Sequence, residues 1–526
     1  MLAGCSSLSR VVAPLDIYGY KGHETRYAGA ATTPESWASP LEPLDPDATT
    51  PLLQQLMPQL AKTDPDGHYR GVTYDLSTDN RLPDGWLLQT PDAWGKPASA
   101  APFATADDRL LHAIYRVISG AQATVDIAVL AELPDGRFLD TLRDAVTALA
   151  RTGRPITVRL LAGIYPTGAA DPVALLNALV RDARAVPGEQ LRVYVATMRS
   201  CAGEAPCHSF SWNHAKIIAV DGHVSLVGGH NMWGPDYLRR TPVHDLSMRL
   251  DGGAVASADR FLDVLWGFAC AGRGQSQALA FHFDRPDIDG DCLATLALPP
   301  HAPTPGHLTV ATVGRLAAGV VTDFGDQSDI ATDLMLGAAR HTIRLSQQDL
   351  GFSLAGIADP VWPEAVLRAL ADLIGKRHGD VFIVLSEPGA EAPSGNSYST
   401  GVTLDQVARR LKAVLMERVP MSGAQADALL CRHLNLASLR FNDWDDAWPD
   451  GTLIANHAKL WVIDDRAFYI GSQNLYPVDL QELGYIVEDR AATEHVLHAY
   501  WDTLWRYSSW AAVSGEGAFR CVVRRP

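Results

Sequence analysis

Apolar and polar positions along the first half of the chain follow alternating helix and strand periods. Residues 107–119 and 137–151 carry apolar side chains at helical spacing, whereas 124–130 and 156–161 are short apolar runs rich in β-branched residues. Two strands joined by a helix form a β-α-β unit, whose strands pair in parallel. The pattern therefore predicts an α/β lobe in this half.

The same order of periods returns in the second half. Residues 341–346 and 381–385 have the pattern of strands, and 364–376 between them has the pattern of a helix. Residues 299–307, which separate the two halves, are rich in proline, and this composition predicts a stiff linker. The sequence thus indicates two lobes of similar construction.

The region before the first lobe has a different composition. It is rich in Pro, Asp, Thr and Gly, and segments such as 40–47 are incompatible with a regular helix or a central strand. The sequence therefore predicts an irregular N-terminal extension (1–100), an N-terminal lobe (101–298), the linker (299–307) and a C-terminal lobe (308–526).

One short polar pattern occurs in both lobes. Residues 213–221 read Asn-His-Ala-Lys-Ile-Ile-Ala-Val-Asp, and residues 456–464 read Asn-His-Ala-Lys-Leu-Trp-Val-Ile-Asp. The alignment continues without a gap to Asn231 and Asn474. A repeat kept for structure alone would preserve the apolar pattern but has no need to preserve His, Lys, Asp and Asn. The repeat therefore indicates one chemical site built from both lobes.

Histidine and lysine lie two residues apart in each copy, so on a strand they face the same side. His214 and Lys216 can therefore share a cavity with His457 and Lys459. This set suits a phosphodiester, because the ammonium groups can stabilise charge on the transition state while one histidine attacks phosphorus and the other protonates the leaving oxygen. The predicted phosphohistidine chemistry needs no metal and no cofactor, since the lysines supply the positive charge.

Further residues of the repeat have roles in this hypothesis. Asn231 and Asn474 are expected to bind the non-bridging oxygens. Asp245 and Glu482 follow the asparagine strands, and we expect them to bind histidine Nδ1 and so fix the tautomer. The remaining motif residues are expected to support the site, by allowing close backbone approach at Gly228, Gly229, Gly471 and Ser472 and by tying down the following turns at Asp221 and Asp464.

Charge and hydropathy narrow the choice of substrate and site. The formal net charge of −16 weighs against a nucleic acid, whose binding proteins usually carry a basic surface. No apolar run is long enough for a transmembrane helix. A zinc site is disfavoured, because a lysine beside each candidate histidine would repel the cation.

The cysteines and the N-terminus bear on location. Cys201 and Cys207 close a short loop and are the expected disulfide pair, with buried free thiols as the alternative. Residues 2–5, Leu-Ala-Gly-Cys, resemble the end of a bacterial lipoprotein signal in which Cys5 is lipidated, but the basic and apolar regions that precede such a site are missing. We favour an oxidising compartment, and chance remains the alternative for the Cys5 match.

The residues at 212–233, 343–349, 468–477 and 484–488 resemble the phospholipase D superfamily, and within it the secreted bacterial enzymes of the Streptomyces kind, over roughly 105–510. The resemblance implies two similar α/β/α lobes with mixed, largely parallel sheets, related by a pseudo-twofold axis, with the active site in the cleft between them. It also implies a monomer. The sequence departs from the family where Glu482 stands, since similar enzymes often have Asp there.

The resemblance further implies that His214 is the nucleophile and His457 the acid, a choice that the symmetric motifs leave open. It implies hydrolysis of phosphatidylcholine-type lipids at a membrane surface to phosphatidic acid, with water or an alcohol as acceptor and no nucleic acid as partner. The alternatives are a cardiolipin synthase-like phosphatidyltransferase, a nuclease, a lipid-degrading antibacterial effector and an inactive lipid-binding module. The expected location is secreted, periplasmic or anchored in a bacterial outer membrane.

Overall fold

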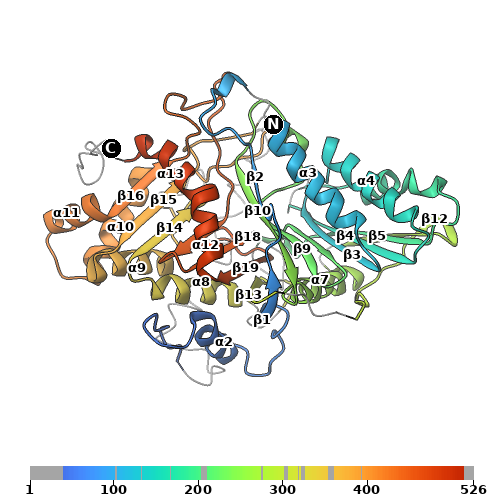
Figure 1. Cartoon of the computed structure of the whole chain (residues 1–526), viewed down its shortest axis with the longest axis horizontal. Coiled ribbons are helices and arrows are strands. Elements are labelled where there is room, and N and C mark those ends of the chain that lie inside the picture. Colours follow the sequence, from blue (N-terminus) through green and yellow to red (C-terminus); the bar gives the residue numbers. More distant parts are fainter. Residues whose placement is uncertain are drawn as a thin grey trace.

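The computed structural model describes residues 40–513 apart from short gaps at 101–103, 132, 166–167, 203–209, 274–275, 301–305, 318, 322–325, 354–359 and 393. Two lobes of strands and helices lie side by side, as Figure 1 shows. Within the described ranges no helix is both long and apolar enough to cross a membrane.

The sheet of the N-terminal lobe combines a parallel half with an antiparallel half. Its order is β5–β4–β3–β8–β9–β10, in which only the pairs among β3, β4 and β5 are parallel. The bounds of these strands are Thr124–Leu130 (β3), Ile156–Gly163 (β4), Leu191–Met198 (β5), Ile217–Val220 (β8), Val224–Gly228 (β9) and Asp245–Gly252 (β10). Strands β11 (Gln277–His282) and β12 (Arg285–Asp289) extend it beyond β5.

The C-terminal lobe repeats this order as β16–β15–β14–β17–β18–β19, again with three parallel strands followed by antiparallel ones. Its strands are Thr342–Ser346 (β14), Asp380–Leu385 (β15), Leu434–Ser438 (β16), Leu460–Ile463 (β17), Ala467–Gly471 (β18) and Glu482–Glu488 (β19). The prediction of two similar α/β lobes with mixed sheets is confirmed.

We expected largely parallel sheets, but antiparallel strand pairs outnumber parallel ones in the described structure. Only three strands in each lobe are parallel, because only these are joined by helical crossovers. The strands that carry and follow the repeated motif are joined by tight turns, such as the one at 221–223 between β8 and β9. A tight turn can join only antiparallel neighbours.

The region before residue 100 is not an irregular extension where the structure describes it. It forms α2 (Leu52–Lys62), β1 (Tyr74–Arg81) and β2 (Leu87–Thr90). Strand β2 pairs with β10, and β1 pairs with both β10 and β13 (Leu308–Arg315), which in turn pairs with β19. The N-terminal region therefore joins the sheets of the two lobes into one.

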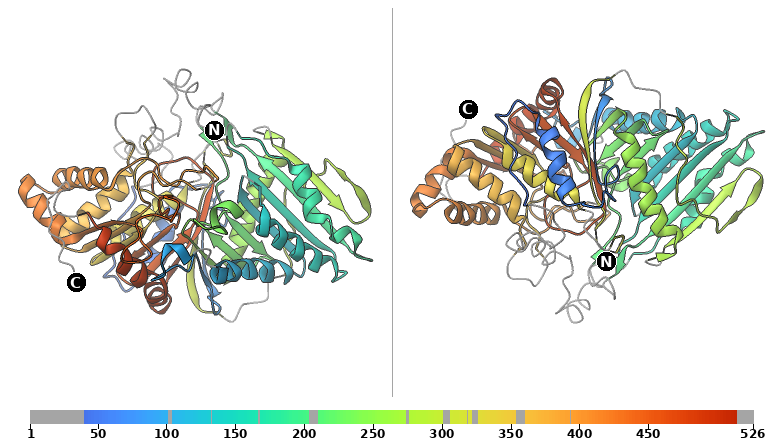
Figure 2. Two further views of the ribbon diagram at one scale, coloured as in Figure 1. Left: turned by 90° about the horizontal axis from the view of Figure 1, so that it is seen from above. Right: turned by 90° about the horizontal axis from the view of Figure 1, so that it is seen from below.

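Helices cover both faces of each lobe (Figures 1 and 2). In the N-terminal lobe one face is covered by α3 (Ala104–Ser119), α4 (Gly136–Ala150) and α5 (Pro172–Val180), and the other by α7 (Val255–Cys270). The C-terminal lobe has α8 (Gln327–Ala338), α9 (Glu364–Asp372), α10 (Leu404–Arg418), α11 (Gly423–His433), α12 (Arg490–Val496) and α13 (Asp502–Ser508). Their apolar faces and the strands between them form two large buried cores.

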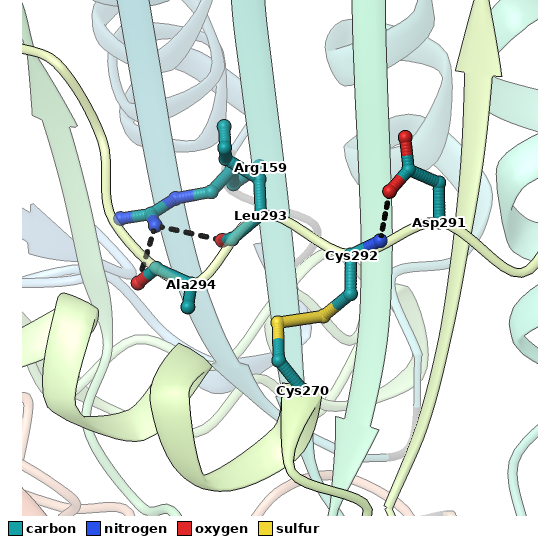
Figure 3. The surroundings of a disulfide bond; sticks show 6 residues. All are labelled: Arg159, Cys270, Asp291, Cys292, Leu293 and Ala294. Carbon is teal, nitrogen blue, oxygen red and sulfur yellow. Dashed lines mark hydrogen bonds between the residues drawn. A yellow bond between two sulfur atoms is a disulfide. The ribbon is translucent and has the colours of Figure 1, made fainter.

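One disulfide, Cys270–Cys292, ties the end of α7 to the segment after β12 (Figure 3). The residues that follow Cys292 pass over β4, where Arg159 Nη1 donates to the carbonyls of Leu293 and Ala294 at 3.1 and 3.2 Å. The expected pair of Cys201 and Cys207 is only partly described: Cys201 is disulfide-bonded, and Cys207 lies outside the described residues, as do Cys5 and residues 301–305 of the linker.

Candidate active site

Each copy of the repeated motif lies where the two lobes meet. His214 and His457 stand just before β8 and β17, and the backbone of each segment bonds to the other lobe. The His214 amide donates to the carbonyl of Gln481 at 2.9 Å, and the His457 amide donates to the carbonyl of His244 at 2.7 Å. These reciprocal bonds bring the two motifs face to face, as expected for lobes related by a pseudo-twofold axis.

The two imidazole rings are close, with their centroids 6.2 Å apart. His214 Nδ1 lies 2.9 Å from Glu482 Oε1, and His457 Nδ1 lies 2.7 Å from Asp245 Oδ2. Each carboxylate thus comes from the opposite lobe to its histidine, a crossing that sequence order does not reveal. Because Nδ1 of each ring is occupied, Nε2 is the nitrogen left for a substrate.

The lysines join the same site, and the asparagines carry buried polar atoms. Lys216 Nζ donates to the carbonyl of His214 at 2.6 Å, and Lys459 Nζ donates to that of His457 at 2.5 Å. Asn474 donates to the hydroxyl of Tyr476 at 2.9 Å. The side-chain oxygens of Asn231 and Asn474 are buried and have no hydrogen-bond partner among the described residues. The structure therefore brings together the two histidines, the two lysines and the two carboxylates proposed for catalysis.

Burial sets the charge of these groups. It lowers the pKa of His214 to about 4 and lowers the pKa of His457 well below its ordinary value. It also lowers the pKa of Lys459 to about 8. Burial alone would raise the pKa of Glu482, but the interaction with His214, which includes a hydrogen bond, and the charge of Arg315 outweigh it and lower that pKa. Near neutral pH the empty site thus holds neutral imidazoles beside an ionised glutamate.

The small residues of the motif permit this close packing. A β-carbon on Gly229 would lie 2.0 Å from Asp245 Oδ1, and one on Gly228 would lie 2.4 Å from the Cα of Ser247. In the second copy, a β-carbon on Gly471 would lie 2.6 Å from the Cα of Gly484. Ser472, at the position of Gly229, accepts from the amide of Leu483 at 3.1 Å.

Comparison with known proteins identifies the family. No family model matches the sequence. A phospholipase D from Streptomyces antibioticus is 32% identical over 527 aligned residues, which cover 89% of this chain and 89% of that protein. The chain belongs to the phospholipase D family. It is a phosphodiesterase of the phospholipase D type.

The solved structures that the chain resembles include a phosphatidylserine synthase from Haemophilus influenzae. The two chains are 13% identical, with a TM-score of 0.49, over 77% of this chain and 85% of the synthase.

Two phospholipase D motif residues, Asp221 and Asp464, act differently from our expectation. We expected them to tie down the turns that follow them. Instead, Asp221 accepts from the backbone amides of residues 122–124 and Asp464 from those of 340–342, all at 2.7 to 2.9 Å. Each aspartate ends a strand beside the start of β3 or β14, so its carboxylate binds the amides that lead into the neighbouring strand.

Three residues at this phospholipase D site escaped sequence analysis. Tyr237 donates from its hydroxyl to Asp245 Oδ2 at 2.8 Å, and the ring of Tyr398 meets that of His457 edge-on with centroids 5.0 Å apart. Arg315 Nη2 lies 3.7 Å from Glu482 Oε1. None of the three belongs to the repeat, so no signal in a single sequence distinguishes them from structural residues.

The described residues contain no group of three or more His, Cys, Asp and Glu side chains arranged to hold a metal ion.

Proposed function

We propose that this phospholipase D hydrolyses phosphatidylcholine-type lipids to phosphatidic acid and the free head group, and that it transfers the phosphatidyl group to alcohols. The observation that supports this most directly is the pair of histidine rings, 6.2 Å apart, each with Nδ1 bound to a carboxylate. Two such histidines can act in turn on one phosphorus atom.

In the first step, neutral His214 attacks phosphorus through Nε2. The bond from phosphorus to the head-group oxygen breaks, and His457 gives its Nε2 proton to that oxygen. This leaves a phosphatidyl group on His214 and a neutral His457. The low pKa of His214, caused first by burial, keeps the nucleophile unprotonated near neutral pH.

In the second step, His457 takes a proton from water or an alcohol, whose oxygen then attacks phosphorus. The bond to His214 breaks, and phosphatidic acid or a phosphatidyl alcohol leaves. Burial and the two lysines lower the pKa of His457 in the empty site. A bound phosphodiester anion opposes the charge of the lysines, so substrate binding favours the protonated form that the first step needs.

Lys216 and Lys459 supply positive charge to this reaction. Burial lowers the pKa of both ammonium groups, and a bound phosphodiester anion favours their charged forms. Both are buried, at 6% and 0% exposure, and each is held by the carbonyl of its own motif histidine. In a site closed to water, such preorganised donors stabilise the charge that develops on the phosphoryl oxygens. We assign Asn231 and Asn474 the role of donating to the same oxygens.

We further propose that the enzyme works as a monomer at a phospholipid surface in an oxidising compartment. Both half-sites belong to one chain, Trp444 is 59% exposed, and Cys270 is oxidised in a disulfide. Sedimentation of a dimer, failure to float with phosphatidylcholine vesicles, or recovery of the native protein from a reducing compartment would each overturn the corresponding statement.

The test is an assay of the purified protein on phosphatidylcholine vesicles with ethanol and EDTA. We expect free choline, phosphatidic acid and phosphatidylethanol, all lost in His214→Ala. His498→Ala, which changes a histidine with a 77% exposed side chain, serves as the matched control and should keep full activity. If only a nucleic acid or another phosphodiester were cleaved in a His214-dependent reaction, the lipid assignment would be wrong. No His214-dependent turnover of any phosphodiester would refute the mechanism.

A further inference from the structure

The two carboxylates that bind the histidines have different surroundings. Asp245 receives a neutral phenol, since the Tyr237 hydroxyl donates to Oδ2 at 2.8 Å. Glu482 lies near a cation, with Oε1 at 3.7 Å from Arg315 Nη2, and its Oε2 has no hydrogen-bond partner within the described ranges. The two motifs are alike, but the residues that contact their two carboxylates are different.

Arg315 is fixed in place. It ends β13, where it pairs in antiparallel register with Glu482 of β19. Its side chain is buried, Nε donates to the carbonyl of Leu480 at 2.9 Å, and Nη1 binds Asp329 Oδ1 at 3.2 Å. The guanidinium stays charged at any accessible pH. A permanent positive charge is thus held near the Glu482 oxygen that bonds His214.

A cation beside a carboxylate weakens the attraction of that carboxylate for a second cation. An ionised Glu482 alone would favour protonation of His214, the histidine to which it bonds at 2.9 Å. A protonated imidazole has no lone pair on Nε2 with which to attack phosphorus. Among the described residues no arginine forms an ion pair with Asp245. The cations that face this carboxylate are the motif lysines Lys216 and Lys459.

We propose that Arg315 is a positioning residue that acts through Glu482, holding this carboxylate and extending to lower pH the range in which buried His214 is unprotonated for attack. The proposal rests on the function proposed above, and it assigns a role to a residue outside the repeated motif.

Other charged groups face the same cluster and limit the size of the effect. Those that face His214 and Glu482 are Lys216, Lys459, Asp245, His457, Tyr469 and Tyr476, and those that face Arg315 are Tyr476, Asp326, Asp329 and Asp479. The three aspartates offset part of the arginine charge. We therefore expect loss of that charge to shift the ionisation of His214 by roughly one pH unit.

The test measures kcat/KM against pH for the wild type, Arg315→Met and Arg315→Lys on a soluble short-chain phosphatidylcholine. The neutral variant removes a positive charge, so His214 should hold its proton to higher pH. The acid limb of the profile should then move up by roughly one pH unit. Arg315→Lys retains the positive charge, so the acid limb of its profile should lie at the wild-type pH. Arg315→Gln, which keeps a donor for Leu480, is a second neutral variant in case the methionine variant does not fold.

Asp329→Asn is the matched control. It breaks the ion pair between Arg315 and Asp329 that a purely structural role would need, but it leaves the guanidinium charge beside Glu482. We expect its acid limb to stay in place or to move to lower pH. An upward shift equal to that of the neutral Arg315 variants would mean that the limb reports a general disturbance, and the proposal would fail.

A second readout does not depend on turnover. Reaction of His214 with diethyl pyrocarbonate requires the neutral imidazole, so its extent against pH, measured by mass spectrometry of the His214 peptide, titrates this group directly. An unmoved titration in folded Arg315→Met or Arg315→Gln would overturn the proposal even if both were less stable. If the wild type turned over no phosphodiester, the proposed function would fail, and this titration would still decide the role of Arg315.

Discussion

The crossed pairing of carboxylates and histidines predicts which variants should behave alike. Glu482→Gln should reproduce the defect of a His214 variant, and Asp245→Asn that of a His457 variant, although each carboxylate lies in the other lobe from its histidine. If each carboxylate bound the histidine of its own lobe, Glu482→Gln would instead resemble a His457 variant and Asp245→Asn a His214 variant. The two amide variants keep the shape of the side chain but remove its charge.

The size of the defect follows from burial. Both carboxylates are fully buried, so water cannot replace the lost charge, and each bond of 2.9 or 2.7 Å is to a ring that becomes cationic in the reaction. A neutral amide can also donate to Nδ1, which moves the ring proton to Nε2 and blocks attack. We expect kcat to fall by about 10³ to 10⁴, equivalent to roughly 4–5.5 kcal/mol of transition-state stabilisation.

The leaving group separates the two defects. Choline leaves as a strongly basic alkoxide and needs a proton, whereas p-nitrophenol leaves without one. In a stopped-flow burst on a phosphatidyl-p-nitrophenol substrate, Asp245→Asn and His457→Ala should therefore recover to within about tenfold of the wild type. Glu482→Gln and His214→Ala should remain slow, because the nucleophile itself is impaired.

The comparison with the alanine variants makes the test independent of which histidine attacks. The crossed pairing requires that Glu482→Gln match His214→Ala on both substrates and that Asp245→Asn match His457→Ala. The opposite matching would show that each carboxylate serves the histidine of its own lobe during turnover, and the interpretation of the contacts would be wrong.

Three further predictions follow from the geometry. Because the pKa of Lys459 is lowered to about 8 by burial, kcat/KM should fall as pH rises through about 8, while kcat should fall only at higher pH, since the bound phosphodiester favours the ammonium form. Gly229→Ala places a β-carbon 2.0 Å from Asp245 Oδ1, so we expect about a hundredfold lower kcat and a loss of roughly 1–3 kcal/mol in urea unfolding. Replacing Cys270 and Cys292 by serine frees a crosslink across 22 residues, which should lower the free energy of unfolding by about 3 kcal/mol without changing kcat of the folded enzyme.

Sequence patterns predicted the lobes well because both apolar periods and polar identities repeat. The expected strands at 124–130 and 381–385 are β3 and β15 within one residue. Residues 40–100 were predicted wrongly, because their prolines and glycines lie between short helices and strands and do not indicate that such elements are absent. The strand at 74–81, for example, reads Tyr-Asp-Leu-Ser-Thr-Asp-Asn-Arg and has only weak apolar alternation. It pairs because two partner strands supply its hydrogen bonds, which is information from the fold and not from the segment.

Some residues of the site could likewise be predicted from the sequence and others could not. Residues inside the repeat could be found from sequence, since an identical histidine, lysine or asparagine at the same spacing is improbable without a shared task. The pairing of Asp245 and Glu482 with the histidine of the other lobe could not be found from the sequence. The spacing along the chain is compatible with pairing inside a lobe and with pairing between lobes. Arg315 and Tyr237 could not either, since each occurs once and contacts the motif through the tertiary structure alone.

The crossing has a consequence for how rigid the site must be. Each lobe supplies one histidine and the carboxylate of the other, so any movement of the lobes apart would break both imidazole–carboxylate bonds together. The lobes are held against such movement by a continuous sheet that runs from β10 through β1 and β13 to β19, the two outer strands of which begin at Asp245 and Glu482. The N-terminal strand β1 is thus a part of the scaffold that fixes the distance between the histidines. A site fixed in this way has its hydrogen-bond donors and charges oriented before the lipid arrives, and substrate access must then come from the loops around the site and not from opening of the lobes.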